Sequence, residues 1–498
     1  MSPSAPRLGV IGLGVMGRNL ALNALDAGAA VAGFDLSADQ ASAFAEESEG
    51  RALVATTAQD EFLDALPSPR ALLVMVPAGR AVDSVIASFA PHLSPGDLLI
   101  DGGNSFFRDT ERRQAELSES GIHFFGMGVS GGEEGARFGP SMMPGGPIEA
   151  YELVDEVLEG MAAKVDGEAC VAHLGTGASG HYVKMVHNGI EYAMMQLLAE
   201  SYDLLKRGFG VSNDALADLF DDWSEGPLQS FLVEITADIF RVRDEAPLPR
   251  TGEEPEAGDE LDQVPPDAEA EPGYVLDAIV DRAAQKGTGK WTSQSALDLG
   301  VPTPTIDAAV TARYMSALKD QRQAAADLLG APERRVEEVE LETFQETLHD
   351  ALHLAFLACY AQGFALLRAA SEEYGFNLHL GEVAKIWRGG CIIRAAMLET
   401  FREAFAADPD LPNLLVAPAV SEILVDDPGA LELVVADAAL AGIPVPAFAS
   451  TLAYIDGYRS AWLPANLVRA QRDYFGAHTF ERSDRDGKFH VDWTPAGM

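Results

Sequence analysis

Cysteine is scarce in this chain, and its positions argue against two kinds of structure. The 498 residues include only Cys170, Cys359 and Cys391, which lie far apart and show no CxxC spacing. This pattern argues against a disulfide framework and against a structural zinc site, so we expect no bound metal. It fits a reducing compartment, and the first residues lack the basic and apolar segments of an export signal. We therefore expect a cytoplasmic protein.

Positive charge and long apolar runs are also in short supply. Lys and Arg number 35 against 77 Asp and Glu, which gives a net charge of −42. Nucleic acid is not expected as a partner, because phosphate backbones select basic surfaces. No uncharged apolar run approaches the length of a membrane span, so no membrane partner is expected either.

Only 8 of the basic residues are lysine, and two explanations of this charge pattern stay open. A GC-rich genome favours arginine codons. A salt-adapted, acidic proteome uses carboxylates to keep protein surfaces hydrated. The charge bears on solubility and not on fold.

The first half of the chain alternates short apolar runs with segments of helical periodicity. Residues 7–11, 31–35, 72–76, 98–101 and 124–129 have the composition of buried strands. Alternation of this kind predicts an α/β domain, in which a parallel sheet is covered by helices on both faces.

Long helices dominate the chain from about Gly180 onward. Residues 181–207, 306–329 and 341–374 have helical periodicity, so we expect a large all-α domain after the sheet domain. From about Ala461 the sequence has little helical periodicity and is rich in aromatic residues and arginine. We expect this C-terminal tail to pack on something else, because it lacks the pattern of a core of its own.

An acidic segment interrupts the helical part at residues 244–273. It holds eleven acidic residues against one arginine, with six prolines and no aromatic residue. Such a stretch buries too little apolar surface to order itself. We interpret it as a surface insertion in the helical domain.

A glycine-rich turn follows the first predicted strand and opens a helix. It reads Gly12-Leu13-Gly14-Val15-Met16-Gly17, and Asp35 ends the next predicted strand. Glycine allows the tight turn and the close approach of a pyrophosphate, which a helix N-terminus then stabilises. The alternative is a plain glycine-rich turn, but strand, turn, helix and acidic residue together favour dinucleotide binding. The segments 76–79 (VPAG) and 101–105 (DGGNS) end two later strands, at the edge where such sheets bind ligands.

One predicted helix presents four polar residues on a single face. In GHYVKMVHNGIEY, residues 180–192, the residues Lys184, His187, Asn188 and Glu191 occupy positions i, i+3, i+4 and i+7. Lys184 and Glu191 are then about 10 Å apart along the helix axis, so an extended six-carbon substrate would meet both. The alternative is a solvated helix face, which the apolar neighbours and the scarcity of lysine disfavour.

Cations also gather in a second glycine-rich segment, QKGTGKWT at residues 285–292. In a chain of such negative charge, clustered cations indicate an anionic ligand, although each alone is more often a surface residue or an ion-pair partner. The candidates for anion contact are Lys286, Thr288, Lys290, Arg313, Arg472 and His478.

Two histidines on one helix face were the remaining candidates for a metal site. His349 and His353 are four residues apart, but no third ligand accompanies them. We interpret them as packing or interface residues.

Seven stretches of the chain match one family in order and spacing. They are GLGVMGRNLA, DGGNS, GMGVSGGEEGARFGPSMMPGG, GHYVKMVHNGIEY, QKGTGKWT, IWRGGCIIR and LPANLVRAQRDYFGAHTF. Over nearly its whole length the sequence resembles the 6-phosphogluconate dehydrogenase family, within the β-hydroxyacid dehydrogenases. The resemblance implies an oxidoreductase of the pentose phosphate pathway and of gluconate utilisation. Its reaction would be oxidative decarboxylation of 6-phospho-D-gluconate to D-ribulose 5-phosphate and CO2, with reduction of a nicotinamide cofactor.

The same resemblance implies an organisation for the chain. Residues 1–178 would form a dinucleotide-binding Rossmann domain, and residues 179–460 a helical substrate and dimerisation domain that carries the 244–273 insertion. Residues 461–498 would form a tail, which in this family threads into the partner subunit of a homodimer.

The resemblance also assigns site residues. The catalytic pair would be Lys184 and Glu191. The substrate would be bound by Asn104, Ser130, Gly131, Gly132, His187, Asn188, Tyr192, Lys286, Thr288 and Arg313 of one chain, with Arg472 and His478 from the other. Of these, Tyr192, Lys286, Thr288, Arg313 and Arg472 match phosphate-binding positions, and Ser130 to Gly132 match the carboxylate site. The cofactor would contact Gly12, Leu13, Gly14, Val15, Met16, Gly17, Asp35, Leu36, Ser37, Val76, Pro77, Ala78 and Asn104.

The implied chemistry suits these residue types. A lysine in a partly buried cationic pocket has a lowered pKa and serves as a base. Lys184 would take the C3 hydroxyl proton while hydride leaves C3, and would later return a proton to the enol oxygen. Glu191 would protonate C1 of the enediol. One group that acts first as base and then as acid removes the need for a metal.

The sequence departs from the family at the edge of the cofactor site. Asp35-Leu36-Ser37 stands where many members have Asn-Arg-Thr or Asn-Arg-Ser, and Val76-Pro77-Ala78-Gly79 stands where they have Val-Lys-Ala-Gly. Both changes remove cations that would meet a 2′-phosphate, and Asp35 would repel one. The sequence therefore predicts NAD as the preferred cofactor, with NADP as the alternative.

Two other interpretations were weighed against this one. A hydroxyisobutyrate-type dehydrogenase would be a much shorter chain without the QKGTGKWT loop and the aromatic tail. A non-catalytic protein on a dehydrogenase scaffold would have no reason to retain both Lys184 and Glu191.

Overall fold

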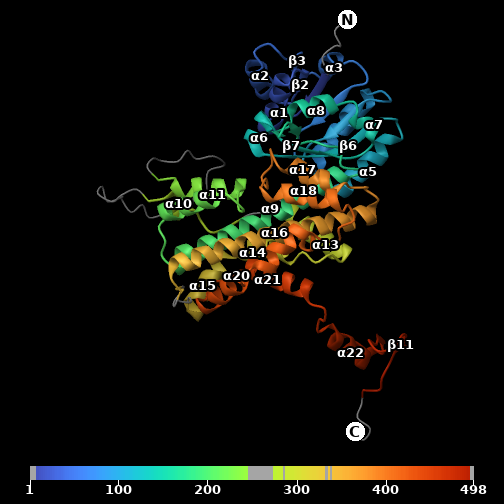
Figure 1. Cartoon of the computed structure of the whole chain (residues 1–498). Helices are drawn as coiled ribbons and strands as arrows, with labels where there is room; N and C mark the ends of the chain where they lie inside the picture. Colours follow the sequence, from blue (N-terminus) through green and yellow to red (C-terminus); the bar gives the residue numbers. More distant parts are fainter. Residues whose placement is uncertain (1–6, 245–272, 284–286, 331–334, 337–338, 494–498) are drawn as a thin grey trace. The chain divides into compact units, whose positions relative to one another are not determined.

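A computed structural model of the chain describes residues 7–244, 273–283, 287–330, 335–336 and 339–493 (Figure 1). Contacts within the chain divide it into two compact units, Met1–Thr451 and Leu452–Met498, which we call the main unit and the tail unit. Apart from its two end residues, the acidic segment 244–273 lies outside the described residues.

The N-terminal part of the main unit is built on a seven-stranded sheet of order β3-β2-β1-β4-β5-β6-β7. Its strands are β1 Arg7–Ile11, β2 Ala30–Phe34, β3 Val54–Thr56, β4 Ala71–Val74, β5 Leu98–Asp101, β6 His123–Ser130 and β7 Ser141–Pro144. The predicted parallel pairing is confirmed from β1 to β6, whereas β7 runs antiparallel to β6. Only residues 131–140 join these last two strands, which is too little chain for a parallel crossover.

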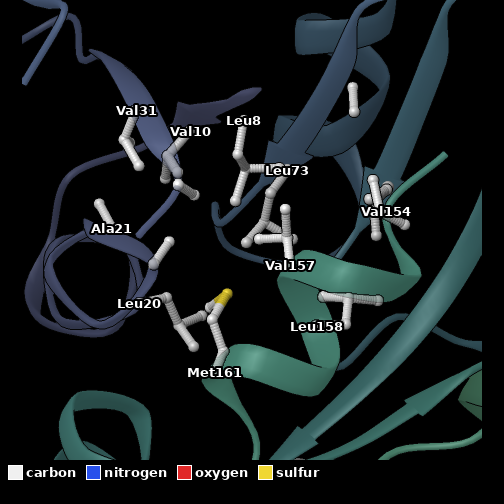
Figure 2. Close-up of a cluster of buried hydrophobic side chains, with 14 of the residues drawn as sticks. Leu8, Val10, Leu20, Ala21, Val31, Leu73, Val154, Val157, Leu158 and Met161 are labelled. Atoms are coloured by element: carbon white, nitrogen blue, oxygen red, sulfur yellow. The ribbon is translucent and has the colours of Figure 1, made fainter. Parts of the chain in front are cut away.

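Helices cover both faces of this sheet, as the alternation in the sequence predicts. They are α1 Val15–Asp26, α2 Ala38–Glu47, α3 Gln59–Asp64, α4 Arg80–Phe89, α5 Phe107–Ser118, α6 Gly132–Phe138, α7 Ile148–Tyr151 and α8 Asp155–Met161. On one face, Leu8 and Val10 of β1 pack with Leu20 of α1 and Val157 of α8 (Figure 2). On the other face, the alternate strand positions pack with side chains from α3, α4 and α5. Because both faces are buried, the strands are continuous apolar runs in the sequence.

The remainder of the main unit is helical and is organised around α9 Ser179–Asp203, which packs against β6, α13, α14 and α16 (Figure 1). The predicted helix over 306–329 is two helices, because Leu318 leaves the helical backbone conformation. The further helices are α10 Asn213–Trp223, α11 Phe231–Arg241, α12 Val275–Ala278, α13 Thr288–Leu299, α14 Pro304–Ala317, α15 Lys319–Leu329, α16 Leu341–Tyr374, α17 Leu380–Trp387, α18 Met397–Ala407, α19 Pro418–Asp426, α20 Ala430–Leu440 and α21 Pro446–Arg459.

Helix α16 is long and apolar enough to cross a membrane by length and composition, which the sequence analysis did not anticipate. Of its most apolar 18-residue window, 83% is buried inside the protein. Burial of this kind is typical of the central helix of a folded helical domain.

The tail unit contains a helix that the sequence analysis missed. Helix α22 Ala465–Gly476 is followed by a short antiparallel pair, β10 Phe480–Glu481 and β11 Lys488–Phe489. In α22, Gln471 and Arg472 interrupt the apolar residues, so the sequence does not show a clear helical period. Within the unit, Asp473 is buried and accepts hydrogen bonds from the Trp493 indole N–H at 2.8 Å and the Thr479 main-chain N–H at 3.0 Å. Asp473 thus joins the helix to the segments that follow it.

Candidate active site

A cleft of about 1010 Å³ opens in the main unit where the carboxyl ends of the sheet strands meet the helical part. Its walls come from the turns after β1, β4 and β5 and from α9, α13 and α14. Sequence-predicted site residues in its wall are Gly14, Val15, Met16, Gly17, Val76, Pro77, Ala78, Asn104, Asn188, Glu191, Tyr192, Thr288 and Arg313. The structure therefore brings predicted cofactor and substrate residues to one place.

The glycine-rich turn has the shape that a dinucleotide requires. Gly12 has a φ of +93°, and a Cβ there would lie 2.4 Å from the Met75 carbonyl oxygen. A Cβ on Gly17 would collide with the Gly12 carbonyl oxygen, whereas one on Gly14 would meet nothing within 4 Å. Gly14 caps α1 without a side-chain hydrogen bond, so the first N–H groups of α1 face the cleft without a protein cap. These groups fit a pyrophosphate.

Asp35 directly follows β2 beside this turn, and its carboxylate accepts hydrogen bonds from the backbone. One oxygen accepts a hydrogen bond from the Leu13 N–H at 2.7 Å, and the other accepts one from the Ser37 N–H at 2.8 Å. Ser37 in turn caps the N-terminus of α2. Asp35 therefore ties the glycine-rich turn, part of which lines the cleft, to the loop before α2, in which Leu36 is exposed.

Glycines on β6 allow α9 to lie directly on the sheet. A Cβ on Gly128 would lie 2.4 Å from the Cβ of Lys184, and a Cβ on Gly126 would lie 2.3 Å from the ring of His181. Side chains of any size at these positions would move α9 away from the strand. The glycines thus set the depth at which Lys184 is buried.

Lys184, His187 and Ser130 form a buried polar cluster beside the cleft. The Ser130 hydroxyl lies 3.1 Å from His187 Nε2, and His187 Nδ1 lies 3.1 Å from Asn188 Oδ1 and 3.4 Å from Lys184 Nζ. Because Asn188 Oδ1 only accepts, Nδ1 carries the hydrogen and Nε2 accepts from Ser130. Glu191 is close as well, with its Oε2 3.7 Å from His187 Nδ1.

Burial changes the proton affinities of this cluster in useful directions. It lowers the pKa of Lys184, against the opposing effect of the Glu191 carboxylate. It raises the pKa of Glu191, against the opposing charges of Lys184 and Arg313. Burial and the Lys184 charge lower the pKa of His187 well below its usual value, so His187 stays neutral. Lys184 is therefore suited to act as a base and Glu191 as an acid near neutral pH.

The predicted carboxylate-binding residues form a turn next to this cluster. Ser130 ends β6, Gly131 precedes α6 with a φ of +117°, and a Cβ on Gly131 would lie 2.6 Å from the Gly390 carbonyl oxygen. The main-chain N–H of Ile392 lies 3.4 Å from the Ser130 hydroxyl oxygen. The segment after α17 therefore closes over the Ser130–Gly132 turn and fixes it.

Three of the predicted phosphate-binding residues, Tyr192, Thr288 and Arg313, line the cleft. The Arg313 guanidinium stacks on the Tyr192 ring, with its carbon 3.8 Å from the ring centre. The Thr292 hydroxyl donates to the Met185 carbonyl oxygen at 2.8 Å, and this bond holds α13 on α9. Thr288, the first residue of α13, thereby reaches the cleft wall.

Of the predicted substrate residues, Ser130, Gly131, Gly132 and His187 are not among the residues that line the cleft, and three more lie outside the described part of the main unit. Lys286 lies outside the described residues. Arg472 in α22 and His478 after it belong to the tail unit, where both are exposed.

Sequence reasoning also missed residues that line the cleft. Phe106 and Trp291 stack with their ring centres 5.0 Å apart, and Asp109 and Met195 lie in the same wall. The position of Phe106 directly after DGGNS and of Trp291 inside QKGTGKWT was the available signal.

The two histidines weighed as metal ligands have other contacts. His349 Nδ1 lies 3.0 Å from the Asp350 carboxylate, and its ring packs edge-on against Trp223. In the described part of the chain, no group of three or more His, Cys, Asp or Glu is arranged to hold a metal.

Comparison with known proteins places this cleft in a family. A profile described as the NAD binding domain of 6-phosphogluconate dehydrogenase matches residues 7–175, and one described as the 6-phosphogluconate dehydrogenase C-terminal domain matches residues 180–493. The chain belongs to the 6-phosphogluconate dehydrogenase family. The sequence-based assignment to this family and to its Rossmann-plus-helical fold is thereby confirmed.

Individual family members match over almost the full length. The NADP(+)-dependent, decarboxylating 6-phosphogluconate dehydrogenase of Bacillus subtilis (strain 168) is 51% identical over 490 residues, which cover 98% of this chain and 99% of that protein. The decarboxylating enzyme of Escherichia coli (strain K12) is 50% identical over 491 residues, with the same coverage. The solved Plasmodium falciparum 6-phosphogluconate dehydrogenase, studied with NADP+ and with 6-phosphogluconate, is 39% identical with a TM-score of 0.89, covering 98% of this chain and 100% of that one.

The predicted preference for NAD over NADP is wrong in the light of these family members. The Bacillus subtilis relative is NADP(+)-dependent, and the Plasmodium falciparum enzyme was solved with NADP+. The prediction treated the Asp35 carboxylate as a free acceptor for a ribose hydroxyl. In the structure each Asp35 oxygen also accepts a backbone hydrogen bond, so this carboxylate has a structural role in the loops that the prediction did not consider.

Proposed function

We propose that this protein oxidises and decarboxylates 6-phospho-D-gluconate to D-ribulose 5-phosphate and CO2, with NADP as the electron acceptor. The observation that carries the proposal is the placement of Lys184 and Glu191 on one face of α9, with opposite pKa shifts, beside a cleft that fits a dinucleotide. The decarboxylating relatives, about half identical over their full length, support it.

The residues of the cleft account for each proton that moves. Neutral Lys184 takes the proton of the C3 hydroxyl, and the nicotinamide, when bound, accepts the hydride from C3. The resulting 3-keto acid loses its C1 carboxylate as CO2, and Lys184 returns its proton to the developing enol oxygen. Glu191 then protonates C1 of the enediol while Lys184 takes back the proton of the enol hydroxyl, which gives the ketose phosphate. Lys184 thus serves as base, acid and base again, and transfer of its proton to Glu191 returns both groups to their starting states.

The remaining predicted residues bind the two charged ends of the substrate. Ser130, Gly131 and Gly132 would hold the carboxylate, with His187 and Asn188 beside it. Tyr192, Thr288 and Arg313 would hold the phosphate, together with Lys286. Asn104 would lie between substrate and cofactor. This assignment is supported by Tyr192, Thr288 and Arg313 in the cleft wall, and by the contact of Ser130 with His187 of α9.

We further propose a homodimer in which Arg472 and His478 of one chain complete the site of the other. The tail unit supports this proposal, because it exposes large apolar side chains, among them Trp462, Leu467 and Phe475. An apolar surface of this kind is typical of a segment that is buried against protein. We also propose a cytoplasmic location, which the three free, buried cysteines fit.

The test is an assay of the purified protein with 6-phosphogluconate and NADP. We expect NADPH, CO2 and ribulose 5-phosphate in equal amounts. Gluconate, which lacks the phosphate, should be a far poorer substrate. No turnover of 6-phosphogluconate with either NADP or NAD would refute the proposed function.

A further inference from the structure

A fully buried guanidinium lies behind the cofactor side of the cleft and has no role in the chemistry above. Arg113 of α5 is 1% exposed. Its Nε–H donates to Asp83 Oδ1 at 2.8 Å, and its Nη2–H donates to the Gly79 carbonyl oxygen at 2.9 Å. Its Nη1 lies 3.2 Å from Asp101 Oδ2 and 3.3 Å from the Ser105 hydroxyl oxygen. A charged group is rarely buried to this extent unless it is paired.

Three partners of Arg113 end or flank two different loops that line the cleft, whereas Asp83 lies in α4. Gly79 ends the loop 76–79 after β4, and Asp101 with Ser105 brackets the loop 102–104 after β5. Residues of both loops form the cleft wall. A planar guanidinium with a fixed fork of donors sets the spacing between such partners more strictly than a flexible ammonium does. Arg113 therefore holds two walls of the cleft at a fixed separation from behind.

The same cluster continues to the helix that carries Lys184. The Asp101 main-chain carbonyl oxygen accepts a hydrogen bond from His181 Nε2 at 3.0 Å, and His181 Nδ1 lies 2.6 Å from the Thr110 hydroxyl. Because a carbonyl only accepts, Nε2 carries the hydrogen and Nδ1 accepts from Thr110. Burial lowers the pKa of His181, which keeps the ring in this neutral form. His181 precedes Lys184 by one helical turn, so the loops and the substrate helix share one hydrogen-bonded frame.

We propose that Arg113 is a positioning residue for the nicotinamide cofactor, which holds the loops 76–79 and 102–104 at the separation that the bound dinucleotide needs. The proposal rests on the proposed function and deepens it. Arg113 does not line the cleft and is not one of the proposed substrate residues. It therefore acts through the loops that it joins. Its loss should therefore weaken cofactor binding more than substrate binding.

The test compares Arg113→Lys with Arg112→Lys. Lysine keeps the positive charge next to Asp101, but a single ammonium does not reach Gly79, Asp83 and Asp101 together. Arg112 is the matched control, because it contacts the same Asp83 at 2.9 Å from a side chain that is 44% exposed. We expect the Kd of NADP, measured by tryptophan fluorescence without substrate, to rise at least ~10-fold in R113K and to stay within about twofold in R112K.

Steady-state kinetics and thermal unfolding separate positioning from a general structural role. In R113K the KM for NADP should rise with the Kd, while the KM for 6-phosphogluconate changes by less than about threefold. A folded R113K protein with wild-type affinity for NADP would overturn the proposal. So would a fall in Tm and in kcat with both KM values unchanged, since that is the signature of a merely structural residue.

A second variant keeps the proposal testable if R113K does not fold. Asp83→Asn removes only the outer carboxylate, which is 43% exposed, and leaves the buried partners of Arg113 in place. D83N should raise the Kd of NADP, as R113K does, but by a smaller factor. An unchanged Kd would overturn the proposal. Binding needs no turnover. A wild-type protein that binds NADP but does not oxidise 6-phosphogluconate would therefore count against the proposed reaction and not against this inference.

Discussion

The main unit and the tail unit differ in their net charge and in the exposure of their large apolar side chains. Residues 452–498 contain six acidic and six basic residues, so the whole net charge of −42 belongs to the residues before them. The main unit buries most of its large apolar side chains in two cores against the sheet and in the helical part, although some, such as Leu36 and Phe138, are exposed. The tail unit instead leaves Trp462 68% and Phe475 72% exposed. An acidic surface suits contact with water, and a neutral apolar one suits contact with protein.

The two units also obtain functional groups in different ways. In the main unit, burial itself shifts the pKa values of Lys184 downward and of Glu191 upward. In the tail unit, Arg472 lies on the short helix α22 and His478 lies in the segment after it. Both side chains are exposed. In the proposed homodimer, the main unit would contain the reactive groups, and the tail unit would contribute binding groups to the site of the other chain. The following experiments test that division.

The largest effect is expected from the reactive group of the main unit. Lys184→Met should lower kcat at least ~10³-fold, because it removes the general acid–base group while conserving its bulk. Steady-state assays with NADP measure the loss, and the exposed Lys164→Met serves as the control. Near-normal turnover of K184M would remove Lys184 from the mechanism.

The next experiment tests whether the tail unit works in trans. Arg472→Ala and Lys184→Met chains are each expected to be inactive as homodimers. After subunit exchange, each heterodimer holds one site with an intact Lys184 and an intact Arg472 from the other chain. A random 1:1 mixture should regain about a quarter of wild-type activity in a twofold-symmetric dimer. No recovery in a mixture shown to contain heterodimers would place Arg472 in the site of its own chain.

The pH profile distinguishes the two buried groups of the main unit. Activity should fall at low pH as Lys184 gains a proton, and at high pH as Glu191 loses one. Since the pKa of Lys184 is lowered and that of Glu191 is raised, both limbs should lie between the ordinary values of about 4.3 and 10.4. Glu191→Gln should react more slowly and lose the fall at high pH. A high-pH limb that persists in E191Q would assign it to another group.

A buried carboxylate at the edge of the main unit should affect stability rather than turnover. Glu200 of α9 accepts hydrogen bonds from the main-chain N–H groups of Ala447 at 2.9 Å and Phe448 at 3.1 Å, in the first turn of α21. Burial nonetheless raises the pKa of Glu200 to about 7. A raised pKa favours folding below the unfolded-state value, and this contribution is lost as pH rises through 7.

The measurement for Glu200 is the thermal midpoint between pH 5 and pH 8. The wild-type protein should lose stability relative to Glu200→Gln by an amount on the order of 1–3 kcal/mol over this range. Glu225→Gln, at an exposed position, should show no such pH dependence relative to wild type. A constant difference between E200Q and wild type across this range would contradict the assignment.

Salt should raise the thermal stability of the acidic main unit. We expect this effect to be the smallest of the series. The Debye length shrinks from about 10 Å at 0.1 M to about 3 Å at 1 M, which screens repulsion among the carboxylates. Thermal midpoints should therefore rise with potassium chloride, more than in an ordinary acidic enzyme. A flat response over this range would leave the arginine-biased genome as the explanation of the composition.

Sequence reasoning located the parts of the site that are local in the chain. The GxGxxG turn and the face of α9 follow from spacing alone, because a turn and a helix are fixed by neighbouring residues. It failed where the answer depends on long-range contacts. One of the two hydrogen bonds that Asp35 accepts comes from Leu13, 22 residues away in the chain, and spacing alone does not reveal this contact.

The buried frame around Arg113 was missed for a similar reason. Arg112 and Arg113 are adjacent and identical in type, and only the packing of α5 on the sheet decides that one is exposed and the other fully buried. Helix α22 was missed because polar residues interrupt its stripe of apolar residues. These apolar side chains are exposed in the single chain. Burial is a property of the folded molecule, so it does not follow from composition.

The glycines of β6 have a consequence for attempts to engineer this protein. Gly128 fits against the Cβ of Lys184 with no room for a methyl group, so this part of the site leaves no space for added volume. The rim includes Met195 of α9 and Trp291 of α13, which are not among the proposed binding residues. Libraries that aim at a shorter or longer sugar acid should therefore vary the rim and leave the strand untouched.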